Sequence, residues 1–195
     1  MLMTLLALAV AAPLHFDCQG PVSQAQSADA LLARFGKDAR RAAIPGAEGR
    51  MTPAVVLFPD DPSRRLEVTF WDKAETAIAS VTTGPRAVAW TGPLGLHLGS
   101  PMAEVVAANG SNITMAGFGW DYGGYVSNSF SGKLSKQACA VQVRLGLPAG
   151  VRGPKSIMGE RELTSAMPDV KAAGPVVEAL SIGWPLPAGV KAGQP

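Results

Sequence analysis

The stretch that decides the fold is Ser-Pro-Met-Ala-Glu-Val-Val-Ala-Ala-Asn-Gly, residues 100–110. Ser100 is a preferred N-cap residue, and proline is favoured at the first helical position, where Pro101 stands. Met102, Val105 and Val106 share one helical face, and Gly110 is the residue type that ends helices. Residues 100–110 therefore predict a short amphipathic helix.

A second stretch of this kind lies earlier, at residues 27–36. Ser27 is placed to cap a helix, Leu31 and Phe35 belong to its apolar face, and Gly36 ends it. Each predicted helix is followed by strand-like segments. The first is followed by a hairpin, residues 54–58 and 66–71 around a turn at 59–63, and the second by residues 113–118, 122–130 and 139–145.

The alternation of residues 139–145 is clear, since Cys139, Val141, Val143 and Leu145 share a face. Residues 87–90 and 94–98 predict further strand material, and residues 176–184 predict a last strand. The pattern predicts an α+β protein of two helix-plus-antiparallel-sheet units that share one core. We expect these units at 18–92 and 93–187, with a long surface loop at 148–173 and a disordered tail at 188–195.

The N-terminus predicts export. Residues 1–12 are almost entirely apolar but too few to span a bilayer. Ala9-Val10-Ala11 fits the small-x-small rule for signal peptidase, so residues 1–11 are interpreted as a signal peptide. The alternative is a buried N-terminal strand or helix. Asp17 before Cys18 argues against a lipid anchor. Export predicts a periplasmic or secreted protein without a membrane span.

The two cysteines, Cys18 and Cys139, are an even number, which permits one disulfide in an oxidising compartment. The alternative is two buried free thiols.

The chain carries 17 basic and 15 acidic residues, a net charge of +2, without a basic cluster interleaved with aromatics. We therefore expect no nucleic-acid binding.

Gly-Phe-Gly-Trp-Asp-Tyr-Gly-Gly, residues 117–124, is the candidate binding segment. In an extended chain Phe118, Trp120 and Tyr122 would lie on one face, because side chains alternate. Such an aromatic ridge suits a partner protein, a peptide or a glycan. The alternative is packing in the core of a sheet. Asp121 and, at the end of the first hairpin, Trp71 complete the set of candidate binding residues.

Catalytic motifs are absent from the sequence. It contains no Gly-x-Ser-x-Gly, no Ser-x-x-Lys and no phosphate loop. With only two histidines it offers no zinc spacing, so we expect no metal and no cofactor. Asp60-Asp61 could suggest a cation site, but these residues are typical of a turn. The alternative to a binding domain is a small periplasmic hydrolase or lyase that uses His97 with Asp121 or Glu104.

Residues 95–105, Gly-Leu-His-Leu-Gly-Ser-Pro-Met-Ala-Glu-Val, resemble a recurring opening of small exported bacterial domains. With the repeated helix-and-strands pattern, the chain is similar to beta-lactamase inhibitory protein and to small outer-membrane lipoproteins of the OmlA type. Its Phe-Gly-Trp-Asp-Tyr-Gly-Gly segment, residues 118–124, resembles that of a group of exported alphaproteobacterial proteins. The resemblance implies a non-enzymatic α+β domain that binds an envelope or periplasmic partner through one sheet face.

Overall fold

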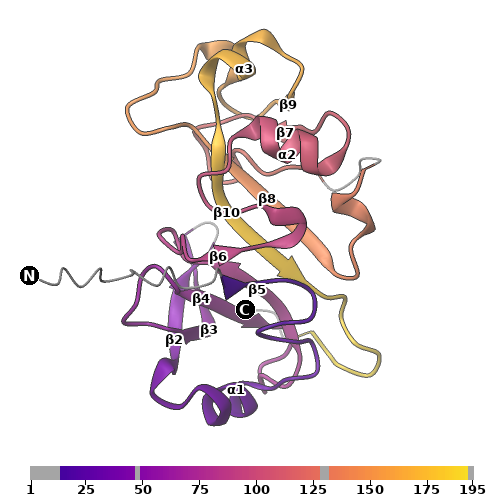
Figure 1. Ribbon diagram of the computed structural model, residues 1–195. Helices are drawn as coiled ribbons and strands as arrows, with labels where there is room; N and C mark the ends of the chain where they lie inside the picture. The colour runs from indigo at the N-terminus through magenta and orange to yellow at the C-terminus, as the bar shows by residue number, and fades with distance from the viewer. Residues whose placement is uncertain (1–13, 47–48, 128–131, 193–195) are drawn as a thin grey trace, which may run out of the picture.

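The computed structural model describes residues 14–46, 49–127 and 132–192, and it confirms an α+β protein (Figure 1). Its centre is a six-stranded antiparallel sheet of order β2-β3-β4-β5-β10-β8. The first half of the chain supplies four of these strands and the second half two. Their bounds are β2 (Ala39–Pro45), β3 (Met51–Leu57), β4 (Leu66–Phe70), β5 (Ile78–Thr83), β10 (Val176–Gly183) and β8 (Ala140–Gly146).

Short elements surround this sheet. Two strand pairs form outside it: β1 (Leu14–His15) is parallel to β6 (Trp90–Thr91), and β7 (Thr114–Ala116) is antiparallel to β9 (Glu162–Thr164). Helix α1 (Ala28–Phe35) lies at one end of the molecule, whereas α2 (Met102–Asn109) and α3 (Pro168–Ala173) lie at the other end (Figure 1). The 3-10 turns are η1 (Gly36–Asp38), η3 (Pro93–Gly95), η4 (Leu134–Lys136) and η5 (Lys155–Ile157).

Helix α1 forms as the sequence predicts. The Ser27 hydroxyl accepts a hydrogen bond from the Ala30 N–H at 3.2 Å, and the Gly36 N–H donates to the Leu32 carbonyl. The helix buries Ala28 and Leu31 in a core that it shares with the inward face of the sheet. That core includes residues from both halves of the chain, among them Val55, Leu57, Val68, Val81, Val143, Leu180 and Ile182.

Helix α2 also forms, but its predicted cap is wrong. Pro101, not Ser100, stands at the N-cap position, and no side chain caps the helix. Ser100 is instead fully buried, with its carbonyl accepting from the Val177 N–H at 2.8 Å and its hydroxyl accepting from the His97 N–H. The hydroxyl is thus engaged in the turn before the helix and does not cap it. The predicted stop at Gly110 is confirmed, since this residue is left-handed.

Several segments that the sequence predicts as strands are turns in the structure. Residues 94–98 form η3 and a turn, in which the Gly92 N–H donates to the Leu96 carbonyl at 2.6 Å. Residues 122–125 are a turn with isolated bridges, and 128–130 of that expected strand lie outside the described residues. Strand β2 was not predicted at all, because Ala-Arg-Arg-Ala-Ala-Ile-Pro lacks the alternation of a half-buried strand.

The expected surface loop at 148–173 is more ordered than its sequence indicates. It holds η5, β9 and α3, and it buries Ile157, Leu163 and Val170 completely. These apolar residues stand too far apart to give a periodic signal. The expected signal peptide, residues 1–11, lies outside the described residues, as do 193–195 of the expected tail, whereas residues 187–190 form a turn.

The predicted disulfide is confirmed. Cys18 and Cys139 are bonded, with their Cα atoms 5.4 Å apart. The bond joins the N-terminal segment to the residue just before β8, across a sequence separation of 121. Among the residues that the structure describes, no helix has the length and apolar character needed to cross a membrane.

Candidate binding site

The segment that carries the candidate residues is a tight turn rather than an extended strand, so the prediction of one aromatic face is wrong. We call residues 117–125 the aromatic turn. The Gly123 N–H donates to the Trp120 carbonyl at 2.9 Å, which closes the turn. Gly119 and Gly124 adopt φ values of 84° and 77°, a region that favours glycine. Strand alternation therefore does not apply to the three rings.

The glycines of the aromatic turn are required by close backbone contacts. A Cβ atom on Gly124 would lie 1.8 Å from the Leu145 carbonyl oxygen, and one on Gly117 would lie 2.4 Å from that of Gly159. The turn is also held by the Gly124 N–H, which donates to the Ala116 carbonyl at 3.0 Å. The aromatic turn is thus clamped between β8 and the segment after η5.

The predicted aromatic residues take different positions. Phe118 is a core residue with 4% of its surface exposed, as the alternative interpretation proposed. Trp120 is half-buried, and its indole N–H donates to the Gly117 carbonyl at 2.8 Å. Tyr122 is 47% exposed, with its ring centroid 5.4 Å from that of Trp120. The Asp121 side chain is exposed.

Tyr125 belongs to the same cluster and was missed by the sequence analysis. Tyr125 is 38% exposed, and the Arg144 guanidinium lies over its ring, 5.1 Å from the ring centroid. Arg144 also donates from Nε to the Gly123 carbonyl at 2.9 Å. Only the turn brings Tyr125 beside Tyr122, so no local spacing could have indicated it.

Trp71 does not join this cluster. It follows β4, at the end of the sheet where β10 finishes, and its indole N–H donates to the Trp184 carbonyl at 3.0 Å. It lines none of the hollows around the aromatic turn. Trp71 thus lies apart from the hollows that the other four candidate residues line.

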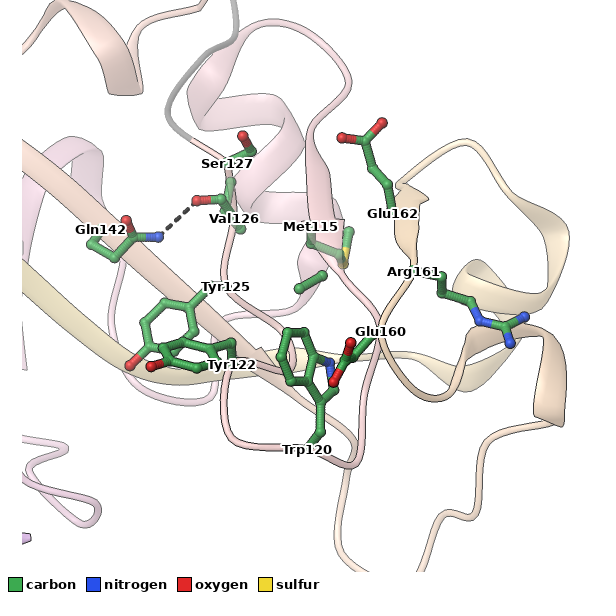
Figure 2. Close-up of a pocket in the computed structure, with 11 residues that line it drawn as sticks. Met115, Trp120, Tyr122, Tyr125, Val126, Ser127, Gln142, Glu160, Arg161 and Glu162 are labelled. Carbon is green, nitrogen blue, oxygen red and sulfur yellow. Dashed lines mark hydrogen bonds between the residues drawn. The ribbon is translucent and has the colours of Figure 1, made fainter. Parts of the chain in front are cut away.

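A groove of about 530 Å³ lies between the aromatic turn and the segment that leads into β9 (Figure 2). Trp120, Tyr122 and Tyr125 form one side, and Glu160 is a further lining residue. The opposite side is polar, with Glu162 and Arg161, whose guanidinium points away from the three rings (Figure 2). The remaining lining residues are Met115, Ala116, Val126, Ser127 and Gln142.

Trp120 also lines two further hollows, so it stands where three depressions meet. One, of about 440 Å³, reaches Leu147, Met158 and Glu178. The other, of about 410 Å³, has the β2–β3 connection on its far side, with Pro45, Gly46 and Gly49. The aromatic turn and that connection, which are far apart in sequence, therefore face each other across one hollow.

The sheet face opposite the core is polar at its centre. Directly paired residues share a face, so Glu67, Thr82, Ser181 and Gln142 form one row across four strands. The Thr82 and Ser181 hydroxyls are hydrogen-bonded at 2.8 Å, and Thr69 and Ser80 pair in the same way. These side chains are only partly buried, and Gln142, at the end of the row, also lines the groove.

The alternative catalytic residues are not brought together. His97 lies in a turn before α2 rather than on a strand, is exposed, and places Nδ1 2.9 Å from the Leu98 carbonyl oxygen. Within the described residues, no hydrogen bond or ion pair joins His97 to Asp121 or Glu104. The described part of the chain also contains no group of three or more His, Cys, Asp and Glu side chains arranged to hold a metal ion.

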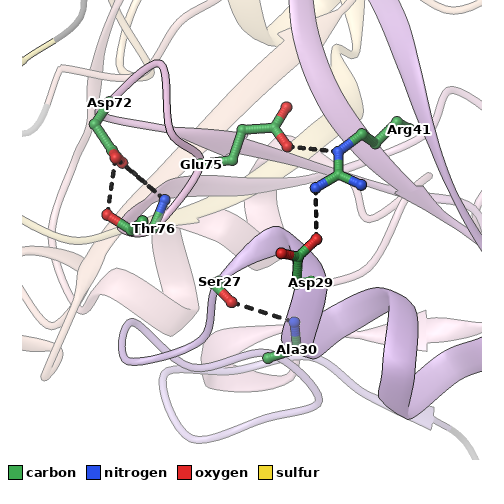
Figure 3. A network of polar contacts seen from close by, with 7 residues as sticks. All are labelled: Ser27, Asp29, Ala30, Arg41, Asp72, Glu75 and Thr76. Carbon is green, nitrogen blue, oxygen red and sulfur yellow. Dashed lines mark hydrogen bonds and ion pairs between the residues drawn. The ribbon is translucent and has the colours of Figure 1, made fainter.

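A separate polar network ties α1 to the sheet (Figure 3). Arg41 of β2 forms ion pairs with Asp29 at 2.8 Å and with Glu75 at 2.7 Å, and these hydrogen bonds raise the pKa of Arg41. Partial desolvation opposes ionisation of Asp72, but hydrogen bonds from Thr76 and the Ala77 N–H still lower its pKa. We assign the network a structural role, because Arg41 joins β2 to Asp29 of α1 and to Glu75, and Asp72 holds its own loop.

Asp61 behaves as the turn residue that the sequence predicts. Its carboxylate accepts hydrogen bonds from the Ser63 hydroxyl at 2.7 Å and the Ser63 N–H at 3.0 Å. The hydroxyl contact is the main cause that lowers the pKa of Asp61.

A comparison of the chain with models of known protein families, with curated protein sequences and with solved structures found no match.

Proposed function

We propose that this chain is a non-enzymatic exported domain that binds an envelope or periplasmic partner through the aromatic turn and the adjoining sheet face. The observation that carries the proposal is the position of Tyr122 and Tyr125. Both rings are exposed, yet the turn beneath them is clamped by backbone contacts with Leu145 and Ala116. Rings held in this way lose little conformational freedom on binding, and aromatic residues contribute much of the binding energy at interfaces.

The alternative, a hydrolase or lyase that uses His97, has less support. A general base needs its partner within hydrogen-bond reach, about 2.6–3.2 Å. The His97 ring nitrogen Nδ1 contacts the Leu98 carbonyl, and the backbone N–H of His97 donates to the Ser100 hydroxyl. Neither group can activate an imidazole as a carboxylate does.

The proposal is tested by screening the full chain against arrays of immobilised peptides and glycans. The tested variant carries Tyr122→Ala and Tyr125→Ala, and the control carries Val88→Ala, since Val88 is also exposed, at 65%, but lies outside the groove. We expect ligands that the control retains and the double variant loses, while both variants melt within a few degrees of the wild type. Equal binding by both variants would remove the aromatic turn from the proposed function.

An exported location fits the disulfide, because such bonds persist in oxidising compartments. We propose that residues 1–11 are removed as a signal peptide and that the mature chain is periplasmic or secreted. Mass spectrometry of the protein from the periplasmic fraction and the medium checks this. An intact N-terminus in the cytoplasmic fraction contradicts it.

We also propose that the fold is a tandem repeat like that of beta-lactamase inhibitory protein. Both halves of the chain contain a helix followed by strands that enter one sheet, α1 before β2–β5 and α2 before β8 and β10. An experimental structure tests the repeat: superposition of the two halves should place α1 on α2, and helices in unrelated places would exclude it.

A further inference from the structure

We infer that the site around Trp120 takes a basic, extended peptide segment of the partner, an inference that rests on the proposed function. The charges around the three hollows favour such a ligand. Four carboxylates line them, those of Asp121, Glu160, Glu162 and Glu178, against two guanidinium groups. The chain as a whole has a net charge of +2, so this local excess of negative charge runs against the composition.

The carboxylates are available, whereas the guanidinium groups are engaged. All four acidic residues are exposed, and within the described residues none of their carboxylates forms a hydrogen bond or ion pair. Arg144 donates to the Gly123 carbonyl and lies over the Tyr125 ring. Arg161 donates to the Ser156 carbonyl at 3.2 Å and points away from the rings (Figure 2). The groove therefore offers acceptors for cations.

The aromatic rings complement the same ligand. The stem of a lysine or arginine is apolar and packs along a ring, while its charged end reaches beyond it. Cations are also attracted to the faces of tryptophan and tyrosine. A basic side chain that lies along Trp120 would enter the groove that Glu160 also lines.

The arrangement of the hollows favours a linear chain over a small molecule. Three depressions of about 530, 440 and 410 Å³ meet at Trp120. An extended peptide places successive side chains on alternate sides, so it can fill separate depressions at once. A neutral glycan could donate hydroxyl hydrogen bonds to the four carboxylates but would lack the charge attraction that a basic peptide has to them.

The test uses three probes with the full, oxidised chain: a peptide of alternating Ser and Lys, its Ser-Glu counterpart, and the neutral sugar chitohexaose. Binding is measured by calorimetry and by NMR shifts of the Trp120 indole and the Tyr122 amide. We expect the lysine peptide alone to bind and its Kd to rise with salt, because exposed charges are screened. Glu160→Gln should weaken it about fivefold, whereas Glu104→Gln, on α2 outside the groove, should leave it unchanged.

The outcomes separate the two claims. If chitohexaose shifts the Trp120 and Tyr122 signals and the lysine peptide does not, the inference of a basic peptide is wrong and the proposed binding site stands. If the lysine peptide binds Glu160→Gln and Glu104→Gln equally, the peptide lies elsewhere and the inference also fails. If none of the probes shifts these signals, and the array screen finds no ligand sensitive to Tyr122, both proposals fail.

Discussion

The hairpin of β3 and β4 and the aromatic turn reach order by opposite routes. In the hairpin, Val55, Val68 and Leu57 fill the core by burying large side chains at alternate positions. In the aromatic turn, the glycines allow backbone to touch backbone, as where Gly124 meets Leu145. The hairpin is stabilised by its buried side chains, whereas the aromatic turn forms only because its glycines have no Cβ atom. Substitutions in the two regions should therefore fail for different reasons.

The largest effect should come from adding one methyl group to the aromatic turn. Gly124→Ala would place a Cβ 1.8 Å from the Leu145 carbonyl at a φ of +77°, so backbone must move. We expect a loss of about 4 kcal/mol or more in the free energy of unfolding, measured by urea denaturation. Gly99→Ala is the control, since Gly99 has a φ of +87° but nothing within 4 Å, and it should cost about 1–2 kcal/mol. Equal losses would mean that the contact with Leu145 is unimportant.

In the hairpin, the corresponding effect comes from removing atoms. Leu57 is fully buried, so Leu57→Ala leaves a cavity and should cost about 2–5 kcal/mol. Met51, on the same strand, is 56% exposed, and Met51→Ala should change stability by less than about 0.5 kcal/mol. Thermal and urea denaturation of both variants measure the difference. Comparable losses would show that the burial of Leu57 does not set its contribution to stability.

A smaller, pH-dependent effect should come from the loop at the end of the hairpin. Asp72 accepts from Thr76 and from the Ala77 N–H, and its pKa is lowered in the folded protein. Its contribution is therefore present above the unfolded pKa, near 3.9, and is lost as the pH falls through the folded pKa. Asp72→Asn should cost about 1 kcal/mol at pH 7 and almost nothing at pH 2. A cost that is the same at both pH values contradicts this.

The same contrast explains how much could be predicted from the sequence. Helix α1, the hairpin, β8 and β10 were predicted correctly, because caps and alternating apolar residues are local signals. The cap of α2 was wrong because the Ser100 hydroxyl accepts from the His97 N–H in the preceding turn, while its carbonyl accepts from Val177 of β10. Strand β2 was missed because it is an edge strand whose two arginines interrupt its pattern.

The candidate site was predictable only in part. Trp120, Asp121 and Tyr122 were found from their unusual spacing, and these three residues do line the hollows. Tyr125, Glu160 and Glu162 were not found, because they join the site only through a turn and through the β7–β9 pairing. Phe118 is 4% exposed but does line the hollow of about 440 Å³, whereas Trp71 lines none of the three hollows. Contacts between distant parts of the chain thus determine which residues line the site, and local sequence patterns do not report them.

The smallest effect on stability should come from the ring most central to the proposed function. Tyr122 is 47% exposed and touches mainly the edge of Trp120, with the ring planes at 63°. An aromatic pair contributes about 0.5–1.5 kcal/mol, and we expect the lower end for a ring as exposed as this one, so Tyr122→Ala should cost less than about 1 kcal/mol. Tyr122→Phe, which keeps the ring, should cost almost nothing. Urea denaturation of both variants tests this. A loss as large as that of Leu57→Ala would make Tyr122 a packing residue like Phe118, and the aromatic turn would then belong with the hairpin as part of the core.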